Sequence, residues 1–266
     1  MIDLRIEERG AAGRVATVVI DNATKLNCMS KGVRDGLLAA FERLGRDEGL
    51  RAVVLTGAGD RAFAGGADVR ELAALASEPE AEAFITEVHR CCDAVRRCPV
   101  PVIARVRGYV LGAGLELAAA CDMRVASDDS HFGMPEVKIG LPSVIEAALL
   151  PQLIGWGRTR YLVLTGETVA VAEARDWGMF DFVVSPGELD ATVERMVAAI
   201  VESGPRAVRA QKALVSDWER LPIEAAVQRG IRALAEAWRT DEPRRMTAER
   251  LAQMQARRGS ADDRSR

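Results

Sequence analysis

The stretch PVIARVRGYVLGAGLELAAACDMRVA, residues 101–126, contains one complete alternation of strand, helix and strand, the pattern that decides the fold. The apolar, β-branched run at residues 100–106 predicts a strand, and Gly108 predicts a turn after it. Residues 111–120 have the apolar pattern of a helix, and residues 122–126 return to a strand pattern. Because strands and helices alternate here, we predict an α/β fold.

The same alternation continues toward the N-terminus. Strands are predicted at residues 14–20 and 52–56, and helices at residues 30–46 and 79–97, with Ser30 as the N-cap of the first helix. After Pro186 the strand pattern gives way to helices, predicted at residues 188–203, 205–218, 222–239 and 243–257.

These patterns divide the chain into three predicted parts. A core at residues 1–186 carries the strands, and a helical region at residues 187–258 follows it. That helical region either caps the core or serves self-association. The small, polar and charged residues 259–266 are expected to form a flexible tail.

Composition excludes several classes of protein. The 266 residues are 48% hydrophobic and 28% charged, which is typical of a folded globular protein. The net charge of −3 gives no basic field for nucleic acid or an anionic membrane. Only two histidines occur, and the five cysteines (Cys28, Cys91, Cys92, Cys98, Cys121) form no C-x-x-C pair, so we predict no metal site and buried, reduced thiols. With no signal-peptide pattern and no membrane-length apolar run, a cytoplasmic protein is expected.

Two glycine loops place backbone amides at the start of apolar segments. In AFAGGADVREL, residues 62–72, Gly65 and Gly66 precede a predicted short helix. Gly112 and Gly114 do the same within the stretch quoted first. Glycine lets backbone approach a ligand closely, and the first N–H groups of a helix have no internal acceptor. We therefore expect each loop to present free amides, although an ordinary tight turn is the alternative for either loop alone.

Two glutamates are expected to lie close to these amides. Glu116 is the only charged residue in an apolar helix, so its carboxyl is expected to be buried with a raised pKa, as a general acid or base near neutral pH requires. Glu136 follows Pro135 in HFGMPEVKIGLPS, where the chain can turn back toward Glu116. A buried glutamate that only satisfies an orphan amide or an arginine is the structural alternative for Glu116.

Four segments together resemble the crotonase superfamily and, within it, the enoyl-CoA hydratases. They are KLNCMS, VVLTGAGDRAFAGGADVREL, the long segment from PVPVIARV to KIGLP, and GRTRYLVLTGETVAVAEARDWGMFDFVV. They occur in the family's order and cover most of residues 10–185. The resemblance implies a spiral of repeated ββα units followed by a helical trimerisation region, assembled as a trimer or a dimer of trimers.

The resemblance also implies roles for individual residues. The Ala67 and Ala113 N–H groups would form an oxyanion hole for the carbonyl of an acyl-CoA thioester, and Glu116 and Glu136 would be the catalytic pair. The implied CoA-binding residues are Arg61 and Arg70 for the phosphates, Ala64, Asp68 and Val69 along the adenine-binding turn, and, with weaker similarity, Lys25 and Lys212.

The implied reaction is the addition of water to a 2-enoyl-CoA to give a 3-hydroxyacyl-CoA, without a metal or redox cofactor. The alternatives are an enoyl-CoA isomerase, which needs only one carboxylate, a hydrolase or decarboxylase of the same superfamily, and a non-catalytic acyl-CoA-binding subunit. The expected partner is the acyl-CoA substrate, with no nucleic acid and no membrane.

The chain departs from the family pattern after the second glutamate. Many hydratases have a glycine-rich turn where this chain reads GLPSVIEAALLPQLIG, residues 140–155. Glu146 is therefore interpreted as a helix-start or surface carboxylate, with a third acid in the pocket as the alternative. Arg105 and Arg107 are also unexpected, and they are predicted to pair with acidic neighbours or to line a subunit contact.

Overall fold

The computed structural model describes residues 1–263, and the side chains of residues 1–256. The chain forms two compact units, which divide after Ala199. The division lies inside helix α6 (Leu189–Glu202) rather than at the predicted boundary after residue 186. The first unit contains all the strands of the described chain, and the second contains the last helices.

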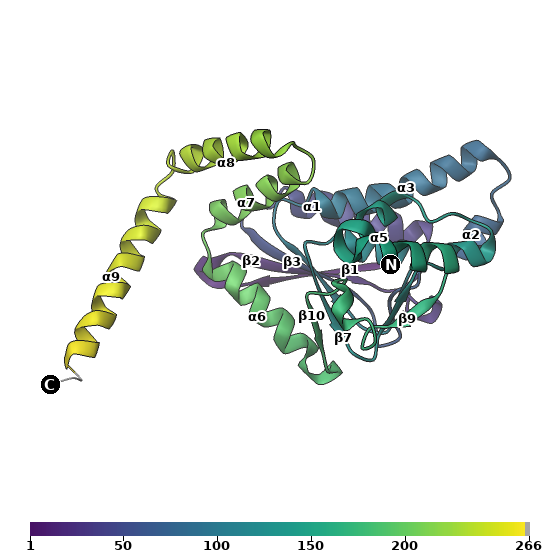
Figure 1. Ribbon diagram of the computed structural model, residues 1–266, viewed down its shortest axis with the longest axis horizontal. Helices are drawn as coiled ribbons and strands as arrows, with labels where there is room; N and C mark the ends of the chain where they lie inside the picture. The colour runs from purple at the N-terminus through teal and green to yellow at the C-terminus, as the bar shows by residue number, and fades with distance from the viewer. Residues whose placement is uncertain (264–266) are drawn as a thin grey trace. The chain divides into compact units, whose positions relative to one another are not determined.

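A six-stranded sheet forms the framework of the first unit (Figure 1). Its strand order is β1-β2-β3-β5-β7-β10, in which β1 is antiparallel to β2 and the other neighbours are parallel. Every residue of β3 is buried, which fits its position inside the sheet. The strands are β1 (Ile2–Glu8), β2 (Arg14–Ile20), β3 (Leu50–Gly57), β5 (Val102–Val106), β7 (Met123–Ser127) and β10 (Phe182–Val184).

A second sheet repeats the order of the first. It contains β4 (Ala62–Ala64), β6 (Tyr109–Leu111), β8 (His131–Gly133) and β9 (Thr168–Ala170), in that order. Each of β4, β6 and β8 directly follows the neighbouring strands β3, β5 and β7 of the large sheet. A helical segment comes next in each case: α2 (Val69–Ala73), α4 (Ala113–Ala119) or the 3₁₀ turn η3 (Pro135–Ile139). The chain is thus a spiral of ββα units, as predicted.

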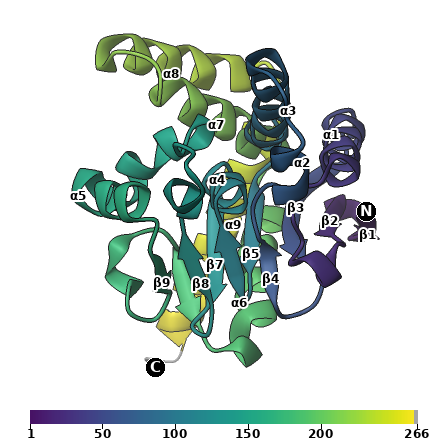
Figure 2. The same ribbon diagram turned by 90° about the vertical axis from the view of Figure 1, so that its right-hand side faces the viewer.

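Helices cover both faces of the large sheet, with α1 (Lys31–Gly45) and α3 (Glu78–Arg96) on one side and α6 on the other (Figures 1 and 2). The side chains of β2 alternate accordingly. Ala16, Val18 and Ile20 join the core that also contains Leu37 of α1, whereas Val15 and its alternate neighbours line the groove beneath α6. All five cysteines are buried, as predicted, and none of them forms a disulfide.

The sequence predictions missed strand β1, helix α5 (Leu150–Thr165) and several short strands, and some element ends differ. The three-residue strands β4, β6 and β8 were not predicted, because three residues give too little periodicity. Leu111, predicted as helical, belongs to β6, and α4 begins only at Ala113. Ser30 occupies the N-cap position of α1, but its side chain makes no capping hydrogen bond.

The second unit consists of α7 (Pro205–Trp218), α8 (Ile223–Ala237) and α9 (Glu242–Asp263). The buried Glu242 carboxylate accepts hydrogen bonds of 3.2 and 2.9 Å from the N–H groups of Arg206 and Ala207, at the start of α7. The predicted tail at 259–266 overlaps the end of α9, and its residues 264–266 lie outside the described chain. Among the described helices, none combines the length and apolarity needed to cross a membrane.

Candidate active site

The two glycine loops lie against each other because they follow neighbouring parallel strands. The first loop follows β4 and the second follows β6. Gly66 has a φ of +99°, and a Cβ placed on it would lie 3.1 Å from the Leu111 carbonyl oxygen and 3.9 Å from the Ala113 nitrogen. Glycine is therefore required at residue 66 both by its dihedral and by the close approach of the second loop.

The amides expected to be free have no acceptor in the structure. Within residues 1–263, the N–H groups of Ala67 and Ala113 donate no hydrogen bond to another group of the chain. Ala113 begins α4, where the first N–H groups of a helix lack an internal partner. The arrangement leaves two backbone donors, on adjoining loops, available to a ligand.

A turn at residues 26–29 fixes the first loop. The Gly65 N–H donates to Leu26 at 2.8 Å, and the Met29 N–H donates to the Gly66 carbonyl, also at 2.8 Å. The buried Asn27 side chain donates to the Ala58 and Ala62 carbonyls on either side of the β3–β4 connection, at 3.0 and 2.6 Å. Asn27 was not predicted as a site residue, although it belongs to the KLNCMS segment.

Arg34 also supports the first glycine loop, and it was not predicted as a site residue. Its guanidinium is buried, donates to the Met29 carbonyl at 2.9 Å, and pairs with Glu71 at 2.8 Å and Glu87 at 3.1 Å. It also lies 4.7 Å from the centre of the Phe84 ring. Arg34 thus connects α1, the short helix α2 and α3. Its only sequence signal is an arginine on the apolar face of a helix.

Glu116 lies in α4, where every residue is buried, and its own exposed fraction is 3%. Its Oε1 accepts a hydrogen bond of 3.1 Å from the Ala147 N–H. Burial raises the pKa of this carboxyl to about 8, and the nearby Glu136 and Glu146 carboxylates add to the effect. The structural alternative for Glu116 named an amide or an arginine as its partner: the amide contact is present, from Ala147, and no arginine pairs with Glu116 within the described residues.

Glu136 lies in the η3 turn and touches the second glycine loop. A Cβ on Gly112, whose φ is +51°, would overlap Glu136 Oε1. The Ser143 hydroxyl donates to Glu136 Oε2 at 2.8 Å. Partial burial raises the pKa of Glu136, and the Ser143 bond opposes that rise. Glu136 therefore lies against the turn that begins α4, the helix of Glu116, and its charge acts on the Glu116 carboxyl.

Glu146 lies in the first turn of a 3₁₀ helix, as the helix-start interpretation predicts, but it is not a surface carboxylate. Its exposed fraction is 7%, and it lies in the 3₁₀ turn η4 (Ile145–Leu149), immediately before the Ala147 amide that binds Glu116. His89 Nδ1 of α3 lies 2.9 Å from Glu146 Oε1. The alternative of a third acid near the pair is the one that fits.

The residues implied in CoA binding occupy different places. Lys25 lies 3.7 Å from Asp68, whose carboxylate caps α2 by accepting from the Arg70 N–H at 3.0 Å. Val69 and Arg70 are exposed at this same helix start, and the Ala64 side chain is fully buried. Lys25, Val69 and Arg70 are thus exposed beside the first loop, whereas Ala64 and Asp68 are buried.

The other two implied CoA residues do not join this cluster. Arg61 is exposed but precedes β4, so the length of that strand separates it from the loop that follows. Lys212 lies on α7 in the second unit.

The unexpected arginines pair with acidic neighbours, as predicted. Arg107 Nη1 lies 2.8 Å from Asp60, and Arg105 Nε lies 2.5 Å from Asp190.

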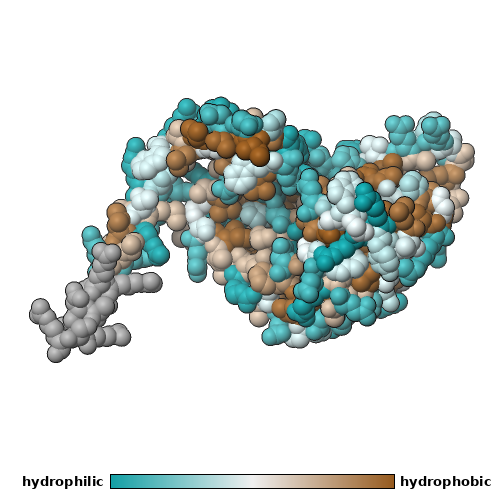
Figure 3. All heavy atoms as spheres, viewed as in Figure 1, coloured by the Kyte–Doolittle hydropathy of each residue, from teal (hydrophilic) through white to brown (hydrophobic). Residues whose placement is uncertain are grey.

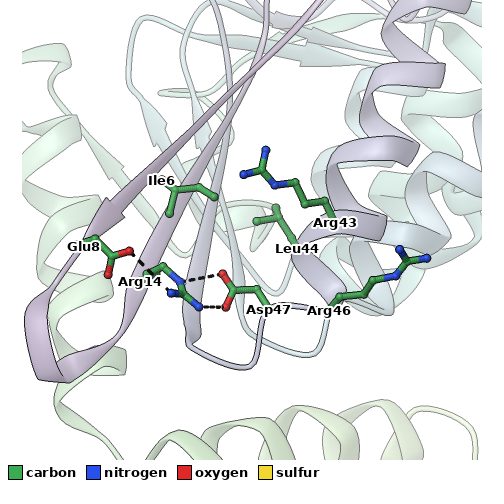
Figure 4. Close-up of a pocket in the computed structure, with 7 residues that line it drawn as sticks. All are labelled: Ile6, Glu8, Arg14, Arg43, Leu44, Arg46 and Asp47. Carbon is green, nitrogen blue, oxygen red and sulfur yellow. Dashed lines mark hydrogen bonds and ion pairs between the residues drawn. The ribbon is translucent and has the colours of Figure 1, made fainter.

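Two pockets lie elsewhere on the first unit. Neither is lined by a residue predicted for catalysis or CoA binding, and Arg105, one of the two unexpected arginines, lines the second. One lies beside the end of α1, where Arg14 binds Asp47 with two hydrogen bonds and also lies near Glu8 (Figure 4). The other is the groove between β2, β3 and α6. Arg43 and Arg46 also line the pocket beside α1, together with the paired Arg14, Glu8 and Asp47.

Comparisons with known proteins agree with this geometry. The family model described as enoyl-CoA hydratase/isomerase matches residues 10–252. The short-chain-enoyl-CoA hydratase of Clostridium acetobutylicum is 31% identical over 231 residues, covering 86% of this chain and 88% of that protein. The crotonyl-CoA hydratase of Syntrophomonas wolfei is 31% identical over 217 residues, covering 80% and 82%.

Solved structures show the same fold. The crystal structure of an enoyl-CoA hydratase from Mycobacterium smegmatis superposes with a TM-score of 0.82 at 33% identity, covering 87% of this chain and 89% of that one. The described spiral, its adjoining glycine loops and the extent of these matches lead to one conclusion. This chain belongs to the enoyl-CoA hydratase/isomerase family of the crotonase superfamily.

Proposed function

We propose that this protein is an enoyl-CoA hydratase, which adds water to a 2-enoyl-CoA to give a 3-hydroxyacyl-CoA. The observation that carries the proposal is the position of Glu136 against the turn that presents the Ala113 amide and begins the helix of the buried Glu116, since both carboxyls have raised pKa values. Double-bond migration needs one such group, whereas addition of water uses two, one for the water and one for carbon 2.

In the proposed mechanism, the Ala67 and Ala113 N–H groups bind the thioester carbonyl oxygen. Negative charge develops on that oxygen as water adds, and one such donor contributes about 3 kcal/mol to stabilising the transition state. Glu116 takes a proton from the water that attacks carbon 3, and Glu136 delivers a proton to carbon 2. Because the two carboxyls interact, they titrate as a pair rather than as independent sites.

The proposal extends to the ligand and the cofactors. Lys25 and Arg70, at the exposed start of α2, are proposed to meet the phosphates of CoA, with Arg61 and Lys212 as further contacts and Ala64, Asp68 and Val69 along the adenine. No metal or redox cofactor is required by this chemistry, and the cytoplasmic location remains a prediction.

We also propose that the protein assembles as a trimer or a dimer of trimers through its helical region. In support, α8 exposes Ile223, Val227, Ile231, Leu234 and Trp238 at spacings of three and four residues, so they share one face of the helix. Figure 3 shows apolar side chains gathered along this helix. Such a face is normally covered in solution. Sedimentation equilibrium tests the assembly, and a monomer would contradict it.

The reaction is tested by product analysis. The protein is incubated with crotonyl-CoA and, separately, with a 3-enoyl-CoA, and the products are identified by mass and absorbance. We expect water addition to crotonyl-CoA to be faster than migration of the double bond. Glu116→Gln and Glu136→Gln are each expected to slow hydration at least 100-fold, because each removes a proton-transfer group. Faster bond migration would support the isomerase, thioester or carboxyl cleavage would support a hydrolase or decarboxylase, and binding without turnover a non-catalytic subunit.

A further inference from the structure

A third carboxyl lies beside the proposed catalytic pair, in the segment that departs from the family pattern. The Ala147 N–H donates both to the Val144 carbonyl at 2.9 Å and to Glu116 Oε1 at 3.1 Å. Glu146 is the residue immediately before that amide, and only 8% of its side chain is exposed. The backbone that binds Glu116 therefore also fixes the position of Glu146.

Glu146 has a partner on one oxygen only. His89 Nδ1 lies 2.9 Å from Oε1, and the His89 side chain is 48% exposed, so the histidine reaches solvent. Oε2 is buried and has no hydrogen-bond partner within the described residues. A buried carboxylate oxygen without a partner is costly, so it is retained at such a place only with a compensating role.

The turn that carries Glu146 is held in an unusual backbone conformation. Ile145 has a φ of +39°, which a β-branched residue adopts only as an outlier. Such conformations persist when the surroundings over-determine them, and they concentrate at functional sites. The consequence here is geometric, because Ile145 directs the chain so that its next two residues face α3 and α4.

The other titratable groups around Glu116 are known from the elements packed on it. Glu136 approaches from η3, Glu146 from η4, and the fully buried Cys92 thiol from α3. Burial raises the Cys92 pKa well above its usual value, so this thiol carries no charge near neutral pH. The charges that act on Glu116 are therefore those of Glu136 and Glu146.

We propose that Glu146, held by His89, is a positioning residue of this active site whose negative charge sets the protonation of Glu116. A like charge close to a carboxyl disfavours its ionised form. Glu146 thus raises the pH above which Glu116 is ionised and able to accept a proton from water. The inference deepens the proposed function and rests on it for its catalytic meaning, but the protonation of Glu116 is measurable without any reaction.

The test follows the Glu116 carboxyl directly. Full-length protein is labelled with [5-¹³C]glutamate, and the Glu116 carbon signal is assigned by its loss in Glu116→Gln. Its titration is then compared in the wild type, Glu146→Gln, and Glu173→Gln, a matched change at an exposed glutamate. We expect the midpoint of Glu116 to fall by roughly 0.5 pH unit or more in Glu146→Gln. We expect no change in Glu173→Gln. An unchanged midpoint in folded Glu146→Gln overturns the proposal.

Two further variants separate charge from structure. Glu146→Asp keeps the carboxylate and is expected to leave the midpoint above that of Glu146→Gln, and His89→Asn, which keeps a donor beside Oε1, is expected to do the same. If Glu146→Gln does not fold, Glu146→Ala removes the same charge and takes its place. If Glu146→Asp and His89→Asn both lowered the midpoint as much as Glu146→Gln does, the role of charge would be overturned.

Kinetics link the result to catalysis. The acid limb of the kcat profile of Glu146→Gln is expected to move to lower pH by the same amount, with KM changing less than kcat. A wild-type protein that hydrates no enoyl-CoA would refute the proposed function, whereas the carbon titration would still decide the role of Glu146.

Discussion

The Ser143 hydroxyl donates a hydrogen bond of 2.8 Å to Oε2 of Glu136, from a segment where many relatives have a glycine-rich turn. The residues that replace those glycines thus reach both proposed catalytic carboxyls: Ser143 binds Glu136, and the Ala147 amide binds Glu116. The altered segment keeps the pair in place through hydrogen bonds that depend on its own sequence.

Ser143→Ala tests this contact. The Ser143 bond favours the ionised form of Glu136, so its loss raises the Glu136 pKa further. We expect kcat for hydration to fall about tenfold because the carboxyl loses its orientation. We also expect the alkaline limb of the kcat profile to move to higher pH. Ser216→Ala on α7 is the control, and a profile identical to that of the wild type would exclude a role for Ser143.

The Gly112 turn gives a sharper steric test. Gly112→Ala introduces a methyl group at a φ of +51° and directly against Glu136 Oε1. We expect hydration to fall at least 100-fold as Glu136 is displaced, in addition to a backbone cost of about 1 kcal/mol. Gly10→Ala is the matched control, because its φ is +60° and no atom lies within 4 Å of the added methyl. Equal activity in the two variants would contradict the placement of Glu136.

Burial of Glu116 also has a consequence for stability. Its pKa of about 8 in the folded protein lies above the ordinary glutamate value of 4.5, so between these two pH values the folded state retains a proton that the unfolded state has lost. The free energy of unfolding therefore decreases as pH rises through this window. Below it the carboxyl is protonated in both states and costs nothing by this route.

Glu116→Gln removes that cost while it removes activity. We expect its melting temperature to exceed that of the wild type at pH 8 and the difference to shrink as pH falls toward 5. Thermal unfolding followed by circular dichroism at both pH values measures this. A melting-temperature difference that does not depend on pH would show that the Glu116 pKa is not raised in the folded protein.

The fold was largely predictable because it depends on local patterns. The strand at residues 14–20 and the helix at residues 205–218 were predicted to the residue, since apolar periodicity and a proline start mark them. Glu116 was also recognisable, as the one charge in an apolar helix. Its neighbours in sequence determine its burial, so no distant contact was needed to infer it.

The rest of the site depends on contacts between distant segments. His89 and Glu146 are 57 positions apart, and Arg34 and Glu87 are 53 apart. Glu146 was predicted as a helix-start or surface carboxylate, and its burial was not predicted because a strained 3₁₀ turn carries it inward. Periodicity does not report such turns, and the sequence alone does not show which helix faces them.

Arg34 provides the last test, since it carries no proposed chemistry and yet supports the first amide loop. Arg34→Met leaves Glu71 and Glu87 without their cation, and because these carboxylates are 31% and 37% exposed, the loss is expected to be about 1–3 kcal/mol. We expect urea unfolding to show a loss of this order. Because Arg34 also binds the Met29 carbonyl beside the first loop, we expect kcat to fall more than the folded fraction explains. Arg43→Met, a change at an exposed residue of the same helix, is the control and should alter neither stability nor kcat. A comparable loss in that variant would show that the effect belongs to α1 as a whole rather than to the ion pairs of Arg34.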